Sequence, residues 1–190
     1  MTPQGRRDVG RKCVAIMAVA VAGAILVGAC RVPGQGVDKG TMQIISSRDA
    51  AQAFAPRVEA FLDTLALRRE KFEVRANRCA GSEGEQRDDI YTIWVGVQAV
   101  APHSDAARVL AEVHDRWRDE GWDITRWRRL ENGGINLGAR DPDGNDWVLD
   151  SGFPAGPDRY VVGFFNTPCM RQPSGAVDFG PITARADLVR

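Results

Sequence analysis

Residues 123–150 read DITRWRRLENGGINLGARDPDGNDWVLD, and this stretch decides the fold that we predict. It contains two turn signals, Asn132-Gly133-Gly134 and Pro142-Asp143-Gly144. Asn-Gly and Pro-Asp-Gly favour tight hairpins, because glycine accepts a positive φ and proline fixes φ at the first turn position. We therefore expect an antiparallel meander of four strands, at residues 123–130, 135–140, 146–150 and 159–166.

Two helices and two more strands are expected before this meander. Apolar residues at a 3.6-residue spacing follow the capping serines Ser46 and Ser47 and predict a first helix, which Pro56 should kink or divide. Alternating residues predict a strand at 71–79, and the more apolar run 90–100 predicts its hairpin partner. A second helix should then begin at Ser104 and Asp105 and end at Gly121.

The order of these elements predicts the fold class. Because the strands are grouped and do not alternate with helices, we expect an α+β fold. It would be a two-layer sandwich in which a twisted, mainly antiparallel sheet of about six strands carries both helices on one face. The globular domain would span residues 46–169, and the Pro- and Gly-containing residues 170–190 would form a loosely ordered tail.

The first 29 residues have the composition of a secretory signal. Four basic residues precede the uncharged run 13–29, which is short for a membrane span of about 20 apolar residues. A cleaved signal peptide therefore fits better than an uncleaved membrane anchor, which remains the alternative.

The leader ends in Val27-Gly28-Ala29-Cys30, which resembles the lipobox of bacterial lipoproteins. The resemblance implies that the chain is cut before Cys30, that Cys30 carries lipid such as palmitate, and that the protein is anchored at the extracytoplasmic face of the cell membrane. Residues 30–45 would be a lipidated flexible tether. Such anchoring needs more than one acyl chain, since a single chain holds a protein only marginally.

Charge and size limit the function classes. Without residues 1–29, the chain keeps 161 residues with 21 basic and 24 acidic side chains. That length is enough for one domain with a core, and the charge gives no electrostatic case for nucleic acid. Arginine greatly exceeds lysine, a bias typical of GC-rich genomes that points to an actinobacterium.

The cysteine count depends on the lipobox. If Cys13 is lost with the leader and Cys30 carries lipid, only Cys79 and Cys169 remain of the four cysteines. In an oxidising compartment, two remaining cysteines indicate a disulfide. A redox pair or half of a metal site is the alternative, but it would need a Cys-x-x-Cys spacing or nearby histidines.

Metal-binding patterns are weak. Several acidic and amide side chains crowd the Gly144 turn as calcium ligands would, but the EF-hand loop has its glycine at position six and a glutamate at position twelve, and this stretch has neither. A hairpin turn is the better interpretation of Asp141, Asp143, Asn145 and Asp146. His103 and His114 are eleven residues apart, which is unfavourable for a two-histidine site. We predict no metal and no cofactor.

Catalytic patterns are equally weak. Ser151 follows Asp150, but it lacks the Gly-x-Ser-x-Gly surroundings of a hydrolase nucleophile. No phosphate-binding glycine loop is present in the sequence. We therefore predict no catalytic residue.

The most suggestive cluster is formed by Trp122, Arg126, Trp127, Arg128 and Arg129. On a strand, Arg126 and Arg128 share one face, and Trp127 and Arg129 share the other. Arginine beside tryptophan is suited to an anionic partner, such as an envelope polymer or a protein. The alternative is an exposed strand face on which arginine stems cover apolar surface.

Several features together resemble the small actinobacterial lipoproteins, including the mycobacterial LppA-like group. They are the lipobox, the strand ending in Cys79, the helix ending in Glu120-Gly121-Trp122, the hairpin over Asp143-Gly144 and the closing Thr167-Pro168-Cys169. The resemblance implies a lipoprotein of unknown function and carries over no functional residues.

Two function classes follow. The first is a non-catalytic binding or scaffolding domain of the cell envelope, anchored through Cys30. The second is a secreted, lipid-anchored enzyme, such as a hydrolase, whose site is built from loops. A sensor or a transport accessory is a weaker third possibility.

Overall fold

The computed structural model describes residues 42–65, 67–80, 85–101, 105–151 and 160–182. The elements follow one another as α1 (Ser47–Thr64), β1 (Arg68–Ala80), β2 (Gln86–Val100), α2 (Ala106–Asp119), β3 (Asp123–Arg129), β4 (Ile135–Arg140), β5 (Asp146–Asp150), β6 (Tyr160–Asn166), β7 (Met170–Arg171) and β8 (Gly180–Pro181).

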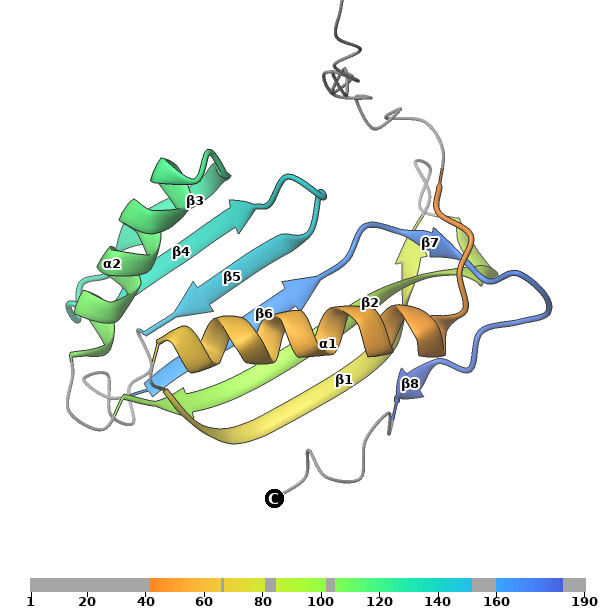
Figure 1. The fold of residues 1–190 in the computed structure, drawn as a ribbon, viewed down its shortest axis with the longest axis horizontal. Helices are drawn as coiled ribbons and strands as arrows, with labels where there is room; N and C mark the ends of the chain where they lie inside the picture. The colour runs from red at the N-terminus through yellow and green to blue at the C-terminus, as the bar shows by residue number, and fades with distance from the viewer. Residues whose placement is uncertain (1–41, 66, 81–84, 102–104, 152–159, 183–190) are drawn as a thin grey trace, which may run out of the picture. The chain divides into compact units, whose positions relative to one another are not determined.

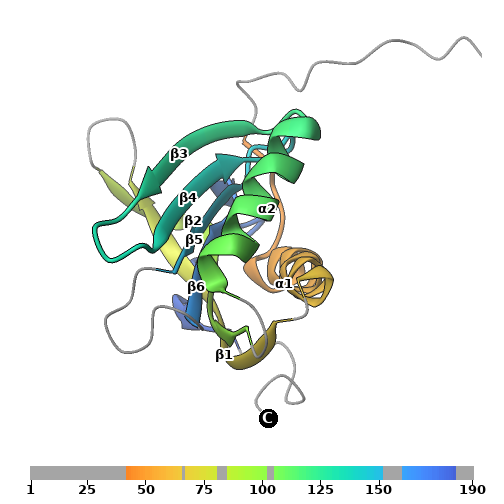
Figure 2. The ribbon, with the colours of Figure 1, turned by 90° about the vertical axis from the view of Figure 1, so that its left-hand side faces the viewer.

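The strands form one antiparallel sheet in the order β3-β4-β5-β6-β2-β1-β8, and β7 pairs with β2 beside this path. Both helices pack on the same face of the sheet (Figures 1 and 2). We call the opposite face the open face. The predicted two-layer α+β sandwich is confirmed, with eight strands where about six were expected.

The two additional strands are short segments beyond Cys169. Met170 and Arg171 pair with Tyr91 and Ile90 of β2, and Gly180–Pro181 pairs with Ala76 and Arg75 of β1. Such two-residue pairings have no alternation of apolar and polar residues, so the sequence pattern gives no sign of them. Within residues 170–190, which we expected to form a loose tail, Met170–Arg171 and Gly180–Pro181 thus belong to the sheet.

Helix α1 begins at the expected cap. The Ser46 side chain accepts a hydrogen bond from the backbone N–H of Asp49 at 3.1 Å. The helix runs through Pro56 as one element, so it is not divided there. Buried side chains on both sides of Pro56, among them Phe54 and Val58, hold the two halves against the sheet. Their packing offsets the backbone hydrogen bond that proline lacks.

Helix α2 is capped by Asp105, whose carboxylate accepts a hydrogen bond from the N–H of Ala107 at 2.8 Å. Ser104, the other expected cap, lies outside the described residues. The chain leaves the helix at Gly121, whose φ of 78° is a conformation that glycine adopts without strain.

Strand β2 shows how the sheet divides its side chains between the two faces. Ile93, Val95 and Val97 are buried and belong to the core under the helices. Because side chains alternate along a strand, Trp94 and Gln98 lie on the open face. The same register places Phe165 of β6 in the core and Phe164 on the open face.

The centre of the core is Trp147 on β5. Its ring contacts five aromatic rings at centroid distances between 5.0 and 6.3 Å, namely those of Phe54, Phe61, Trp117, Trp122 and Phe165. Edge-to-face pairs of this kind contribute about 0.5–1.5 kcal/mol each beyond their buried area. The aromatic cluster therefore joins α1, α2 and the sheet.

Cys79 and Cys169 form the predicted disulfide, with their Cα atoms 6.0 Å apart. Cys79 lies near the end of β1, and Cys169 lies between β6 and β7. The backbone near α1 is held at the same end, because Ile45 N–H donates to the Arg171 carbonyl at 3.0 Å and Arg171 N–H donates to the Gln43 carbonyl at 2.9 Å.

Candidate functional site

Arg126 and Arg128 lie on β3, at one edge of the sheet. They stand opposite Gly138 and Asn136 of β4, so both side chains project from the open face. Arg126 Nη1 donates to Asn136 Oδ1 at 3.1 Å, and Asn136 Nδ2 donates to Asp150 Oδ2 at 2.9 Å. Arg128 has no hydrogen bond or ion pair within the described part of the chain. Its guanidinium is available to a ligand.

Trp127 lies on the other side of β3, opposite the buried Leu137. Its ring stacks on the imidazole of His114 from α2, with centroids 4.1 Å apart and planes 25° apart. The side chain is still 44% exposed. The alternation expected for this strand therefore holds, and it separates Trp127 from Arg126 and Arg128.

Trp122 is partly buried and packs against the core. Its ring stacks on Trp117 at 4.9 Å with an angle of 9°, and it contacts Trp147 at 5.4 Å. Of the five residues of the predicted cluster, the structure thus brings only Arg126 and Arg128 to the open face, whereas Arg129, opposite the buried Ile135, lies on the same side of β3 as Trp127. Trp122 and Trp127 hold α2 against the sheet.

Two other aromatic residues lie on the open face and were missed in the sequence. Trp94 of β2 and Phe164 of β6 have ring centroids 6.1 Å apart and planes 28° apart, and Phe164 is 39% exposed. The signal for Trp94 was its position between Ile93 and Val95, because neighbours on a strand that face the core place the residue between them on the opposite face.

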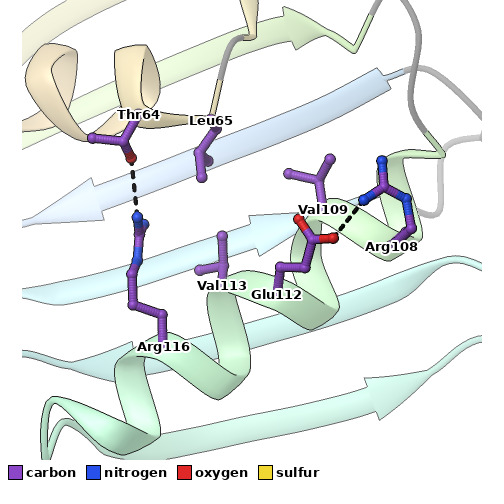
Figure 3. Close-up of a pocket in the computed structure, with 7 residues that line it drawn as sticks. All are labelled: Thr64, Leu65, Arg108, Val109, Glu112, Val113 and Arg116. Atoms are coloured by element: carbon purple, nitrogen blue, oxygen red, sulfur yellow. Dashed lines mark hydrogen bonds and ion pairs between the residues drawn. The ribbon is translucent and has the colours of Figure 1, made fainter.

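A small pocket of about 280 Å³ lies between the end of α1 and α2 (Figure 3). Leu65, Val109 and Val113 supply its apolar wall. Arg116 Nη1 donates to Thr64 Oγ1 at 3.1 Å, so Arg116 is held by a neutral hydroxyl and also by the Phe61 ring. The other charged groups of the lining, Arg108 and Glu112, pair with each other. A single cation with no further polar group beside it does not define a ligand, so we assign the pocket no chemistry.

The turn that could have suggested calcium is built around the buried carboxylate of Asp141. Its oxygens accept hydrogen bonds from Asn145 N–H at 2.8 Å, from Asn145 Nδ2 at 2.7 Å and from Trp147 Nε1 at 3.0 Å. Arg57 of α1 pairs with Asp141 at 3.3 Å and with Asp143 at 3.0 Å. These contacts occupy the carboxylate and give it a structural role.

The other candidate groups also have structural partners. Ser151 is fully buried, and its hydroxyl accepts a hydrogen bond from Ile135 N–H at 2.9 Å. His114 Nδ1 lies 3.0 Å from Asp115, whereas His103 lies outside the described residues. Among the residues that the structure describes, no group of three or more His, Cys, Asp or Glu side chains could hold a metal ion.

Tyr91 is a buried residue whose hydroxyl has a clearly raised pKa. Burial raises the pKa of its hydroxyl to about 12, and the negative charge of Asp49 adds to the effect. The hydroxyl donates to the Ile45 carbonyl at 2.7 Å. Tyr91 therefore holds the segment that precedes α1.

The chain matches no protein-family model, no curated protein and no solved structure. None of the helices in the described ranges is long and apolar enough to cross a membrane.

Proposed function

We propose that the protein is a lipid-anchored, extracytoplasmic binding domain that holds or scaffolds another component of the cell envelope. The Val27–Cys30 pattern supplies the anchor. The observation that supports the extracytoplasmic location is the contact of Cys79 with Cys169 in the folded domain. Disulfides persist in oxidising compartments and are rare in the bacterial cytosol, so this pairing supports a location of the domain outside the cytoplasm.

The proposed arrangement separates attachment from binding. Lipid on Cys30 holds the chain at the membrane, and residues 30–45 connect it to the domain. Ile45 is fixed to Arg171 and Tyr91 by hydrogen bonds, so tension on the tether acts on an anchored segment of the domain. The open face then binds the partner, because the helices occupy the other face (Figure 2).

Arg126 and Arg128 give this surface a basic edge. Arg128 has no partner in the described structure, and Arg126 is held only by a neutral amide. Guanidinium groups in this state favour anionic polymers, since each can form charge-assisted hydrogen bonds to carboxylate or phosphate. We therefore include an anionic envelope polymer among the proposed partners, along with a protein.

Anchoring is tested by expressing the full chain in a bacterium that processes lipoproteins and labelling the cells with an alkynyl fatty acid. The protein should carry label and sediment with membranes. Cys30→Ala should lose the label, whereas Cys13→Ala, the control, should retain it. A labelled Cys30→Ala protein would contradict the proposed anchor.

Binding at the basic edge is tested on a heparin column. The variant Arg126→Ala/Arg128→Ala should elute at a lower salt concentration than the parent, because it loses two exposed cations. Arg108→Ala is the matched control, since Arg108 is also exposed but pairs with Glu112 on α2. Identical elution of the double variant and the parent would remove the basic edge from the proposal.

A further inference from the structure

The open face carries an aromatic surface that neither the anchor nor the basic edge uses. It consists of Trp94, Gly96 and Phe164, and we call it the aromatic platform. In the register, Gly96 of β2 stands opposite Phe164 of β6, and Trp94 lies two residues before Gly96 on the same face. The three residues therefore form one continuous patch.

The indole of Trp94 lies flat across Gly96. A Cβ atom added at Gly96 would come within 2.1 Å of the Trp94 ring atom Cη2, and within 2.6 Å of Cζ2. Gly96 itself is buried, although it faces away from the helices, because this ring covers it. Since a strand interior disfavours glycine, the close approach is the physical reason for its presence here. The ring is thus held parallel to the sheet.

Phe164 extends the surface that Trp94 begins. The two ring planes differ by 28° and their centroids are 6.1 Å apart. Rings in this arrangement lie side by side, with neither ring covering the other completely. Phe164 is 39% exposed, and Trp94 is half-buried. The platform therefore presents aromatic area outward, at a fixed orientation.

The polar groups beside the platform are amides without partners. Asn166 stands opposite Trp94 in the register, and Gln98 follows Gly96 by two residues. Within the described ranges, neither side chain makes a hydrogen bond or ion pair. Each amide offers two donors and one acceptor oxygen, so both suit a ligand rich in hydroxyl groups.

The charged side chains in register with the platform neutralise one another. Arg75, opposite Trp94, pairs with Glu73 at 2.9 Å. Asp146, opposite Asn166, pairs with Arg140 at 2.9 Å. Lys71, opposite Gln98 at the margin, has no partner among the described residues. The centre of the platform is therefore complementary to a neutral ligand.

We propose that the aromatic platform is a binding site for a neutral glycan. A pyranose ring has a face of C–H groups and a rim of hydroxyls. The C–H face packs on the indole and phenyl rings, whose π faces are negative, and the hydroxyls bond to Asn166 and Gln98. This proposal rests on the proposed binding function and specifies its ligand class. It requires neither lipid at Cys30 nor the side chains of Arg126 and Arg128.

The test uses the full chain in a detergent without a sugar headgroup, because an alkyl glycoside would compete for the site. Chitohexaose, cellohexaose and maltohexaose are titrated by calorimetry. At least one should bind, and its affinity should be unchanged in about 0.5 M NaCl, since no ion pair is involved. To exclude binding at the basic edge, a heparin hexasaccharide is titrated into the Arg126→Ala/Arg128→Ala variant. It should bind no better than the neutral sugar, and a preference for it that Lys71→Ala abolishes would contradict the neutral ligand.

Variants place the sugar on the platform. Trp94→Ala should weaken binding by about tenfold, and Phe164→Ala by a smaller factor, because each removes a ring from the contact. Gly96→Ala should weaken binding while leaving both rings in the chain, since its Cβ displaces the indole. Trp127→Ala is the control: its ring is exposed but lies on the helix side of the sheet, so binding should be unchanged.

Three results would overturn the proposal. The first is that no hexasaccharide binds at about 10 mM. The second is that Trp94→Ala binds with the parent affinity. The third is a dimer that Trp94→Ala dissociates, which would assign the platform to self-association.

Near-ultraviolet circular dichroism verifies that each variant is folded. Should Trp94→Ala not fold, Asn166→Ala and Gln98→Ala replace it, because they change only the polar contacts. Both should weaken sugar binding, and parent affinity in both would overturn the proposal. Loss of Cys30 labelling would leave all of these results unaffected.

Discussion

At the scale of single residues, Asp141 is the polar group on which the packing depends most. Its buried carboxylate orients the indole of Trp147, the ring at the centre of the aromatic core. We expect Asp141→Ala to lower the free energy of unfolding by about 3 kcal/mol, because it leaves buried donors of Asn145 and Trp147 without an acceptor. Urea unfolding followed by tryptophan fluorescence measures this loss.

Asp143 is the matched control for Asp141. It pairs with the same Arg57, but its side chain is 68% exposed. An exposed ion pair contributes about 0–1 kcal/mol, so Asp143→Ala should change the free energy of unfolding little. Equal losses in the two variants would mean that the Arg57 pairing, and not the buried hydrogen bonds, holds this turn.

The raised pKa of Tyr91 leads us to expect a loss of stability at alkaline pH. Its pKa is about 12 in the folded protein against 10.0 for an ordinary tyrosine. Between these values the unfolded chain releases the phenolic proton and the folded chain keeps it, so the free energy of unfolding falls as pH rises. The stabilisation is complete below pH 10 and is lost as pH approaches about 12.

Tyr91→Phe isolates this effect. At neutral pH it should lower the free energy of unfolding by about 1 kcal/mol, because the hydrogen bond to Ile45 is lost. The gap between parent and variant should then narrow above pH 10. A constant gap across that range, measured by chemical unfolding at each pH, would show that Tyr91 ionises alike in both states.

At the scale of elements, α1 contains a proline that its packing tolerates. Pro56 is exposed in the middle of the helix, and Phe54 and Val58 on either side of it are buried. Pro56→Ala should raise the free energy of unfolding by about 1–2 kcal/mol, because it restores a helical hydrogen bond. The greater conformational entropy of the unfolded chain without proline offsets a small part of this gain. Gln52→Ala, one turn earlier and also exposed, should change it by less than about 0.5 kcal/mol. Thermal unfolding compares the two, and a destabilised Pro56→Ala would refute the argument.

Strand β3 shows two functions divided between the faces of one element. Trp127 packs against His114 under α2, and Arg126 and Arg128 project from the open face. Charged side chains on an edge strand also discourage pairing with another chain. The basic edge therefore protects the sheet at the same place where we propose that it meets an anionic partner.

At the scale of the whole molecule, the disulfide links segments that are 90 residues apart in the sequence. Restricting the unfolded chain by a loop of this length is worth about 4–5 kcal/mol in the chain-entropy model. We expect Cys79→Ser/Cys169→Ser to lose stability of this order. Reduction of the parent by dithiothreitol should produce the same change, whereas the reductant should have no effect on the double variant. An unchanged unfolding midpoint after verified reduction would contradict this expectation.

The sequence by itself determined the elements with strong local signals. Strands 135–140 and 146–150 were predicted at their observed bounds, because the turns at Gly133 and Gly144 need a positive φ that glycine supplies. The grouping of strands gave the α+β class, and counting cysteines under the lipobox resemblance led to the pairing of Cys79 with Cys169. Each of these inferences rests on neighbours in the chain or on composition.

Only the tertiary structure decided which side chains share a surface. Strand alternation separates Trp127 from Arg126 and Arg128, but only the packing of α2 places the Trp127 ring on His114 and the partly buried Trp122 ring on Trp117. Trp94 and Phe164 come together from strands 70 residues apart, through the pairing of β2 with β6. Local propensity carries no information about such pairings, because burial under α1 and α2 fixes which face each residue occupies.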